Sequence, residues 1–316
     1  MQVISKRIEV AVGVLQQGDR VLVGQRLVED RYFQKWEFPG GKLEKNETPT
    51  DALTRELSEE LGIEVIHSRP LIQLDHDYPD RRVRLYIYLV DNFEGEPQGV
   101  EGQSIKWVDL KDLTELDFLE ANQPIFNALR FPTLHVITNI AEYGLDKTLE
   151  KITGLDKKFR SKFIVQLREW YKSDKELTFL LREIRQVTQS QFIILNGDPY
   201  QAHQLGFDGV QLNSQRLKKH ANKSLEFDSD FHVGASCHNL EELKMAEAFA
   251  DFALLSPIKF TNSHPDRNGL GWTQFMSLVN EVNLPCYALG GLSEEDLSDS
   301  FKYGAQGISS ISSIWG

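Results

Sequence analysis

The sequence predicts an α/β protein of two domains, a mixed-sheet domain followed by a (β/α)8 barrel of the TIM type. The chain has 316 residues, a length typical of two domains. Its first part mixes β-rich runs with helical patterns, whereas its second part alternates short apolar strands with helices. We place the boundary inside the stretch RFPTLH, which gives predicted domains of residues 1–131 and 132–316.

The first domain opens with a predicted β-hairpin. The runs RIEVAVGVL (Arg7–Leu15) and RVLVGQR (Arg20–Arg26) are rich in β-formers, and the turn signal QQGD separates them. Two more strands and a closing helix follow: VRLYIYLV (Val83–Val90), SIKWVDL (Ser104–Leu110) and ANQPIFNALR (Ala121–Arg130). Asn122 is a candidate N-cap of that helix, because Pro124 would then stand in its first turn.

The segment from Thr48 to Gly62 predicts a well-delimited helix. Thr48 is suited to the N-cap and Pro49 to the first helical position, and Asp51 stands three residues after the cap. A packing stripe repeats every four residues: Leu53, Leu57 and Leu61. Gly62 favours the left-handed backbone that ends many helices.

The same helix carries an acidic cluster. Glu56, Glu59 and Glu60 stand at positions i, i+3 and i+4 and therefore share one face. Like charges at this spacing weaken a helix by a few tenths of a kcal/mol, roughly. Hard divalent cations such as Mg²⁺ prefer carboxylate oxygens and bridge them to substrate phosphates. The cluster indicates a metal site that acts on phosphates, and the alternative is a solvated helix face.

The cluster is part of a longer pattern. Gly41 is followed by five residues, Glu47, seven residues, Arg55-Glu56-Leu57, one residue, Glu59-Glu60, one residue and Gly62-Ile63. This is the Nudix box, and the segment resembles the Nudix hydrolases, which cleave nucleoside diphosphates linked to another group. The resemblance implies an α/β/α sandwich with a mixed sheet for the first domain. It also implies Mg²⁺, or alternatively Mn²⁺, as the cofactor.

The family's pattern assigns roles to residues of the box. The implied metal site comprises Gly40, Glu56, Glu59, Glu60 and Glu101. Glu101, in the stretch VEGQ, matches a remote carboxylate of the family. Arg55 and Glu47 are expected to brace the loop and helix by an ion pair, and with Glu56 they form the implied catalytic set. The pattern leaves open whether Glu56 binds the metal or polarises the attacking water.

Segments outside the box resemble the MutT type of Nudix hydrolase over about Ile8 to Arg130. They are EFPGGK (Glu37–Lys42), YPDR (Tyr78–Arg81), EGEPQGVEGQ (Glu94–Gln103) and ANQP (Ala121–Pro124). MutT-type enzymes hydrolyse 8-oxo-dGTP to the monophosphate and pyrophosphate, which removes a mutagenic precursor before DNA replication uses it. The resemblance implies a substrate pocket formed by Arg26, Glu37, Phe38, Arg81 and Asn122.

Asn122 offers a chemical basis for that preference. 8-Oxoguanine has an N7–H donor where guanine has an acceptor, and an Asn amide can accept from N7–H while it donates to O6. Guanine would leave buried polar groups unpaired, at about 1–3 kcal/mol. Two other hypotheses remain open: hydrolysis of a thiamine-related pyrophosphate, and a sensor that uses the Nudix fold only for binding.

The second domain contains eight candidate strands. They are TLHVIT, KFIVQLR, QFIILN, GVQLN, FHVGAS, FALLSPI, PCYALGG and GISSIS. Helical patterns such as DKELTFLLREIRQV and NLEELKMAEAFA lie between most of them. Nearly continuous apolar strands that alternate with helices favour parallel β/α units, buried on both faces of the sheet. Eight such units predict a compact TIM-type barrel.

The barrel region resembles thiamine-phosphate synthase and its relative, the thiazole tautomerase TenI. Matching stretches include VQLRE (Val165–Glu169), FDGVQL (Phe207–Leu212), GASCHNLEEL (Gly234–Leu243) and ALGGL (Ala288–Leu292). The resemblance implies a site for a phosphate or a thiamine-related phosphate, formed by Arg168, Ser236, Gly290, Gly291, Ser309 and Ser310. In other barrels such residues follow strand ends and present backbone N–H groups.

The barrel departs from the synthase pattern at the positions that matter for chemistry. Trp170 stands where the synthase has a pyrophosphate-binding lysine, and Gly197 follows Asn196 where it has an Asn-Asp metal pair. Gln215 stands where the second metal aspartate is expected, and Asp198 is a one-residue-shifted substitute for the first. These departures favour a degenerate phosphate-binding module. An inert barrel and residual synthase or tautomerase activity remain open.

Composition restricts the protein's setting and partners. The formal net charge is −12, which disfavours direct binding of nucleic acid, because that affinity rests largely on neutralising phosphates. No apolar run approaches the roughly 20 residues that span a bilayer, so no membrane association is expected. The chain contains 2 cysteines, Cys237 and Cys286, which favours a reducing cytoplasm. The expected partner is a small-molecule nucleotide.

Overall fold

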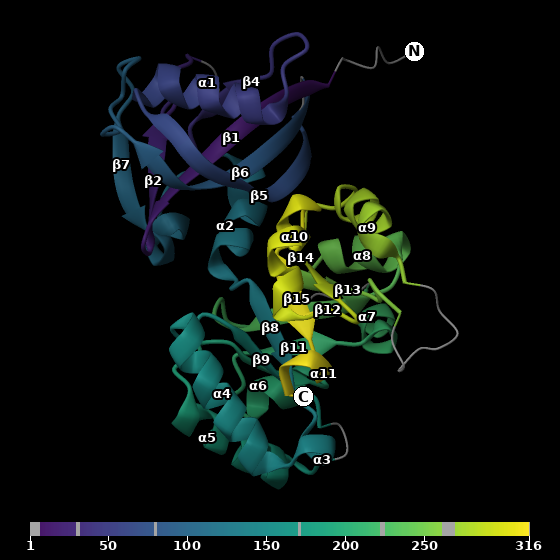
Figure 1. The fold of residues 1–316 in the computed structure, drawn as a ribbon. Helices are drawn as coiled ribbons and strands as arrows, with labels where there is room; N and C mark the ends of the chain where they lie inside the picture. Colours follow the sequence, from purple (N-terminus) through teal and green to yellow (C-terminus); the bar gives the residue numbers. More distant parts are fainter. Residues whose placement is uncertain are drawn as a thin grey trace. The chain divides into compact units, whose positions relative to one another are not determined.

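The computed structural model describes residues 7–29, 32–78, 81–169, 172–221, 225–260 and 269–315. The chain divides into two compact units, Met1–Arg130 and Phe131–Gly316 (Figure 1). The second unit begins one residue before the boundary expected from the sequence. No helix within the described residues is both long and apolar enough to span a lipid bilayer.

The first unit is built on a mixed, seven-stranded sheet. Its strands are β1 (Ile8–Gln17), β2 (Arg20–Gln25), β3 (Trp36–Glu37), β4 (Gly40–Lys42), β5 (Glu64–Asp77), β6 (Arg82–Glu94) and β7 (Ile105–Asp109). The main order is β3-β2-β1-β6-β5, with β4 paired to β1 and β7 paired to β2. β1 runs parallel to β6, and the other pairs are antiparallel, including the predicted hairpin of β1 and β2.

Two helices cover opposite faces of this sheet, α1 (Pro49–Leu61) and α2 (Gln123–Arg130) (Figure 1). Side chains of β1 alternate between the two cores: Ala11 packs with the helix α1 core, and Val12 with the helix α2 core. Gly13 lets α1 approach closely, because a Cβ there would lie 2.7 Å from Leu57 Cδ1. The sandwich with a mixed sheet is therefore confirmed.

Strand β5 was not expected from the sequence. It contains Pro70, which removes a hydrogen-bond donor and usually argues against a strand. β5 lies at the edge of the sheet, where one side of the strand needs no partner, and its pairing with β6 contains register shifts on both sides of Pro70. The edge position makes the proline compatible with the ladder.

The N-cap prediction for Asn122 is wrong. Two short 3₁₀ turns, η1 (Leu110–Glu115) and η2 (Glu120–Asn122), precede helix α2, so Asn122 ends a turn instead of capping a helix. Its side-chain Nδ2 donates to the carbonyl of Leu119, at 3.1 Å. The local pattern Asn-x-Pro is compatible with either arrangement, and the preceding turn decides between them.

The second unit is a closed barrel of parallel strands, as predicted (Figure 1). Its strands are β8 (Leu134–Ile137), β9 (Ile164–Leu167), β10 (Ile193–Asn196), β11 (Gly209–Leu212), β12 (His232–Cys237), β13 (Phe252–Leu255), β14 (Cys286–Leu289) and β15 (Gly307–Ser310). β15 pairs with β8 and closes the barrel. Each strand lies in one of the expected apolar runs, with β12 extending one residue further to Cys237, so the barrel fold is confirmed.

Helices surround the barrel strands (Figure 1). They are α3 (Ile140–Tyr143), α4 (Leu145–Phe159), α5 (Asp174–Val187), α6 (Pro199–Gln204), α7 (Ser214–His220), α8 (Leu240–Glu247), α9 (Gly271–Val279), η3 (Glu294–Asp296), α10 (Leu297–Lys302) and α11 (Ser312–Trp315). Their apolar faces pack against outward-facing strand residues in one large core. A smaller core fills the barrel interior.

Phe131 closes the floor of the barrel. Its ring lies 4.8 Å from that of Phe252 and 5.4 Å from that of Phe192, measured between centroids. Its carbonyl accepts a hydrogen bond from Gln306 Nε2 at 2.7 Å. The side chain is only 3% exposed. These contacts are why Phe131 belongs to the barrel and not to the first unit.

We expect Gly307→Ala to destabilise the barrel strongly. A Cβ at Gly307 would lie 1.8 Å from the carbonyl oxygen of Thr133, which is backbone of the neighbouring strand and cannot rotate away. The loss should reach about 3 kcal/mol or more in chemical denaturation. Gly154→Ala in α4 is the matched control, because no atom lies within 4 Å of its Cβ. It should be neutral or stabilise by up to about 1 kcal/mol. Equal effects of the two substitutions would contradict this packing.

Candidate active site

The loop and helix that carry the acidic cluster have the predicted ends. Thr48 is the N-cap of α1, and its hydroxyl accepts from Asp51 N at 3.2 Å. Asp51 Oδ2 accepts in return from Thr48 N at 3.4 Å, which completes a capping box. Gly62 ends the helix in the left-handed region, with φ 67°. The helix is therefore fixed at both ends, and its acidic face has a defined direction.

Arg55 joins three glutamates of the Nudix-type segment. Its Nε and one terminal nitrogen, Nη2, each contact a different oxygen of Glu47 at 2.9 Å, in a bidentate pair. The other terminal nitrogen, Nη1, lies 2.7 Å from Glu56 Oε1 and 3.4 Å from Glu59 Oε2. Hydrogen bonding to Arg55 lowers the pKa of Glu47. The structure therefore contains the expected Arg55–Glu47 ion pair and extends it to two more carboxylates.

Gly40 and Gly41 allow the helix carboxylates to approach the preceding loop. The backbone N–H of Gly40 donates to Glu60 Oε2 at 3.0 Å. A Cβ at Gly41 would lie 2.2 Å from the carboxyl carbon of Glu56. Gly40 has φ 145°, and a Cβ there would lie 2.1 Å from the carbonyl oxygen of Ala11. Any larger side chain at either position would push the acidic residues out of place.

Glu60 is the most perturbed carboxyl group of the cluster. Burial is the largest cause and raises its pKa to about 7, while the hydrogen bond from Gly40 N opposes the shift. The nearby carboxylates of Glu56, Glu101 and Glu37 raise the pKa further. Four acidic side chains are thus close enough to interact electrostatically. A cation placed among them would relieve the repulsion.

The described side chains do not form a finished metal site. Among the residues that the structure describes, no three acidic, histidine or cysteine side chains are arranged to hold one ion. Glu56 and Glu59 are directed to Arg55, whereas Glu60 is bonded to Gly40 N. The donor set still fits a hard divalent cation, because carboxylate oxygens are its preferred ligands and Glu56, Glu60 and Glu101 interact.

A cleft of about 340 Å³ connects the acidic cluster to the expected substrate pocket. Its polar lining residues are Gln25, Arg26, Tyr32, Glu37, Lys42, Glu60, Tyr78, Arg81, Glu101, Gln103 and Asn122. All five residues of the expected substrate pocket line it, together with Gly40, Glu60 and Glu101 of the expected metal site. Glu56 and Glu59 do not line the cleft; both carboxylates contact Arg55 instead. The cleft therefore has an acidic end and a mixed polar and apolar end.

Asn122 lies at the mixed polar and apolar end of the cleft, and a hydrogen bond fixes the orientation of its side-chain amide. The residue is 5% exposed, and Nδ2 is held by the carbonyl of Leu119. Among the described residues no group donates to Oδ1, so this oxygen is available as an acceptor. Phe38 lines the same end, but its ring packs against Phe118 and Phe126, with centroids 5.5 and 6.4 Å away. The Phe38 side chain is therefore mainly a core residue.

A group of aromatic and charged side chains borders the cleft. Arg26 pairs with Glu37 at 3.4 Å, and the Arg81 guanidinium lies 5.3 Å from the Tyr78 ring centroid. Tyr32 contacts Tyr78 edge-on, with the centroids 5.3 Å apart. Tyr78 stands in the quoted YPDR stretch but was not singled out in the sequence. No sequence signal indicates Tyr32, which reaches the cleft only through the fold.

The barrel residues that were expected to bind a phosphate differ in backbone conformation, exposure and hydrogen bonding. Gly290 and Gly291 have φ 108° and 68°, and a Cβ at either would lie 2.9 Å from the loop after β13. The Ser310 hydroxyl is already used, because it donates to the Leu292 carbonyl at 3.1 Å. Arg168 is exposed just after β9, and Ser236 Oγ accepts from Gln211 Nε2 at 3.0 Å. A phosphate there would depend on backbone N–H groups more than on the serine hydroxyls.

Four polar side chains lie inside the barrel. They are His135, Gln166, Gln211 and Ser309, and each is at most 1% exposed. The His135 ring contacts Phe252 and Tyr287 of strands that do not neighbour β8, so it points into the barrel. Burial lowers the pKa of His135 to about 3 and keeps the ring neutral. The nearby Gln166 side chain opposes this shift, although the pair does not reach hydrogen-bond geometry.

These four side chains carry polar atoms without a partner. Within the described residues, His135 Nδ1 and Nε2, Gln166 Oε1, Gln211 Oε1 and Ser309 Oγ complete no hydrogen bond. Buried polar atoms in native proteins are usually satisfied by protein, water or ligand atoms. Buried water or a bound molecule would supply the partners that these atoms lack. Of the four, only Ser309 was expected at a site, because His135, Gln166 and Gln211 each stand as single polar residues in an apolar strand.

Asp198 was the one carboxylate that could replace a missing metal aspartate of the synthase pattern. Asp198 is the N-cap of α6, and its Oδ1 accepts from Tyr200 N and Gln201 N at 3.0 and 3.2 Å. This oxygen of Asp198 is therefore engaged as a helix cap. Trp170, at the expected position of the pyrophosphate-binding lysine, lies outside the described residues.

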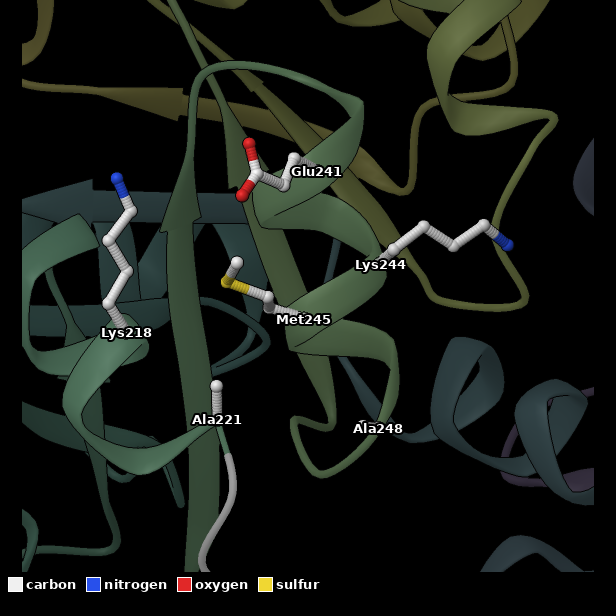
Figure 2. A pocket seen from close by; sticks show the side chains of 6 residues that line it. All are labelled: Lys218, Ala221, Glu241, Lys244, Met245 and Ala248. Carbon is white, nitrogen blue, oxygen red and sulfur yellow. The ribbon is translucent and has the colours of Figure 1, made fainter.

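An open hollow on the outside of the barrel lies between α7 and α8 (Figure 2). Its lining residues are Lys218, Ala221, Glu241, Lys244, Met245 and Ala248. Figure 2 shows the side chains of Lys218 and Lys244 pointing away from each other. Each lysine also pairs with a glutamate of α8, Glu242 and Glu247 respectively. The hollow therefore lacks converging charged groups and is unlike the cleft of the first unit.

Comparison with known proteins assigns a different family to each of the two compact units. The family described as NUDIX domain matches residues 6–129, and the family described as thiamine monophosphate synthase matches residues 135–314. An 8-oxo-dGTP diphosphatase of Escherichia coli is 39% identical over 40% of this chain and 98% of its own length. A putative thiamine-phosphate synthase 2 of Aquifex aeolicus is 38% identical over 58% of this chain and 98% of its own length. A CTP pyrophosphohydrolase of Escherichia coli is 31% identical over 39% of this chain and 91% of its own length.

The raised pKa of Glu60 predicts a pH-dependent penalty on stability. The folded group titrates near 7 instead of 4.5, so the folded state binds more protons between these values and loses stability as pH rises. Glu60→Gln should therefore stabilise the first unit at pH 8 by up to about 3 kcal/mol, and much less at pH 5. Calorimetry with a chelator present measures the difference. Exposed Glu64→Gln, the control, should show no such pH dependence. An equal effect of Glu60→Gln at both pH values would contradict the assignment.

Proposed function

Because this chain belongs to the Nudix hydrolases through its first domain and to the thiamine monophosphate synthase family through its second, we propose that it hydrolyses 8-oxo-dGTP to 8-oxo-dGMP and pyrophosphate. The first domain is a Nudix hydrolase acting on phosphoric anhydrides. The proposed activity would clear an oxidised precursor from the nucleotide pool and so prevent mutation. The observation that carries the choice of base is the buried Asn122 amide at one end of the cleft.

The base end of the cleft supports discrimination against guanine. Asn122 Oδ1 is available to accept a hydrogen bond, and N7–H of 8-oxoguanine is a donor in the corresponding position. Guanine presents an acceptor there, which would leave two buried acceptors facing each other. Tyr78 and Arg81 border the same end and offer an aromatic face and a cation for stacking. A site built around a required donor can discriminate by orders of magnitude.

The acidic end of the cleft supports the hydrolytic step. Water attacks a phosphorus atom, the α–β bridging bond breaks, and pyrophosphate leaves. Glu60 lines the acidic end of the cleft, so its carboxylate stands where the phosphates of a bound nucleotide would lie. Arg55 holds Glu47 and Glu56, so the loop and helix keep one geometry as charge develops.

Nudix hydrolases generally depend on a divalent metal, and we propose Mg²⁺ here, with Mn²⁺ as a substitute. Glu56, Glu59, Glu60 and Glu101 would hold it, with Gly40 next to it. When bound, the cation supplies neutralisation of phosphate charge and a lower pKa for water. Arg55 contacts one oxygen of Glu56 and one of Glu59, so the second oxygen of each carboxylate can contribute a ligand atom.

We propose further that the barrel binds a small phosphorylated ligand without performing synthase chemistry. The supporting observation is the set of unpartnered polar atoms on His135, Gln166, Gln211 and Ser309 inside the barrel. The absence of metal carboxylates at Asn196-Gly197 and Gln215 argues against the synthase reaction. A thiamine-related phosphate is the ligand class that the family membership favours.

Asn122→Ala tests the choice of nucleotide. We expect its kcat/KM for 8-oxo-dGTP to fall roughly 10- to 100-fold, while that for dGTP changes little, because only the oxidised base uses Oδ1 as an acceptor. Steady-state assays with 8-oxo-dGTP, dGTP, CTP and thiamine pyrophosphate measure this. Gln123→Ala is the matched control, since this neighbouring amide is exposed. Wild-type protein that shows no large preference for 8-oxo-dGTP would overturn the proposal.

Gln166→Leu tests the barrel proposal. It removes an unpartnered buried carbonyl, so it should leave stability unchanged or raise it slightly. If the carbonyl contacts a ligand, affinity for thiamine monophosphate should fall about 10-fold in calorimetric titration of the full chain. Lys175→Gln, at an exposed position of α5, is a control for binding. Unchanged affinity in Gln166→Leu, or no binding to wild-type protein, would count against a ligand site in this interior.

A further inference from the structure

The segment between β6 and β7 docks on the C-terminal end of helix α1. Gln98 N donates to the Leu61 carbonyl, and Val100 N donates to the Glu60 carbonyl, both at 3.0 Å. The last carbonyls of a helix have no partner within the helix and need one from outside. The docked segment supplies these partners, so its position is tied to the helix that carries the acidic cluster.

Gln103 connects this segment to the helix a second time, through its side chain. Its Nε2 donates to the Glu60 carbonyl at 2.9 Å, and its Oε1 accepts from Glu101 N at 3.0 Å. One partner is an acceptor and the other a donor, so the amide has only one workable orientation. The Gln103 side chain therefore spans the backbone of Glu60 and the backbone of Glu101.

Glu101 stands at the tip of a tight turn next to Gln103. Gly102 N donates to the Gly99 carbonyl at 3.0 Å, and Gly102 has φ 89°. A Cβ at Gly99 would lie 2.0 Å from the Gln103 carbonyl oxygen, so the turn closes against Gln103. Among the described residues, the Glu101 carboxylate makes no hydrogen bond of its own. Its position is therefore set by its backbone.

We infer that Gln103 is a positioning residue of the proposed cation site: its side-chain amide holds Glu101 beside Glu60 across the acidic end of the cleft. Gln103, Glu60 and Glu101 all line that cleft. This inference rests on the proposed function, since it concerns the same site. It adds a residue outside the Nudix box that determines where the remote carboxylate stands. Gln103 touches no reacting atom and acts only through Glu101 and the end of α1.

Cation binding itself is the most direct test. Mn²⁺ is titrated into the full-length wild-type protein, Gln103→Met, Gln103→Glu and Gln98→Met, and free Mn²⁺ is followed by electron paramagnetic resonance. Gln103→Met keeps the length of the side chain and removes both hydrogen bonds. Gln98→Met is the matched control, because Gln98 lies in the same segment, is exposed, and contacts the helix only through its backbone N–H.

We expect Gln103→Met to bind Mn²⁺ roughly three- to ten-fold more weakly than wild type, the scale of losing one ordinary hydrogen bond. Gln98→Met should bind like wild type. The Mn²⁺ concentration for half-maximal hydrolysis should shift with the affinity, while kcat at saturating Mn²⁺ recovers. Unchanged Mn²⁺ affinity in Gln103→Met, with wild-type binding intact, would overturn the positioning role alone. No Mn²⁺ binding by the wild type would overturn the proposed cation site instead.

Gln103→Glu separates positioning from simple charge and serves if Gln103→Met does not fold. It keeps an acceptor for Glu101 N but places an oxygen against the Glu60 carbonyl, and it adds negative charge to the cleft. If affinity followed the number of carboxylates, Gln103→Glu would bind Mn²⁺ more tightly than wild type, and that result would contradict the inference. We expect weaker binding, because the amide's donor is lost.

Discussion

The first domain depends on how α1 accommodates the negative charge crowded at its C-terminal half. Arg55 gathers Glu47, Glu56 and Glu59 on one side of the loop, whereas Glu60 turns to the cleft and accepts from Gly40 N. A buried carboxylate with one neutral donor is less well compensated than one facing a guanidinium, and this explains why the pKa of Glu60 is the one that rises to about 7. The glycines at 40 and 41 make this division possible, because any Cβ there would occupy space needed by backbone or by Glu56.

Local features of the site could be predicted from the sequence, and features that depend on distant contacts could not. The ends of α1 and its buried leucines follow from spacing within about fifteen residues, so local chemistry fixes them, whereas the Arg55–Glu47 pair was expected from the resemblance to the Nudix hydrolases. Strand β5 was missed because Pro70 argues against a strand until the edge position of β5 is known. Gln103 and Tyr32 were missed for a similar reason. The bond of Gln103 to Glu60 joins residues 43 apart in the sequence, and no local pattern indicates it.

In the barrel, too, the strands could be predicted from local sequence, but the polar interior could not. Its strands were predictable because apolar runs of four to eight residues alternate with amphipathic helices. In each of LHVI, IVQL and GVQL, however, one polar residue stands among apolar ones, and hydrophobicity alone does not reveal which way it points. Closure of the barrel brings these residues together, since β8, β9 and β15 are neighbours and β11 stands one strand beyond β10. A polar interior of this kind is a property of the closed sheet and not of any single strand.

The two proposed sites rest on different physics. The cleft of the first domain gathers carboxylates, and a cation makes that arrangement favourable, so charge governs binding and chemistry there. The barrel interior is neutral: burial holds His135 uncharged, and the other unpartnered atoms are amide and hydroxyl oxygens. In a low dielectric such atoms discriminate strongly among hydrogen-bonding partners but stabilise a developing charge poorly. Loss of the carboxylate-dependent synthase reaction is therefore compatible with retained ligand binding in the barrel. Recognition needs oriented dipoles, whereas transfer of a phosphorylated group needs the metal carboxylates that this barrel has replaced with Gly197 and Gln215.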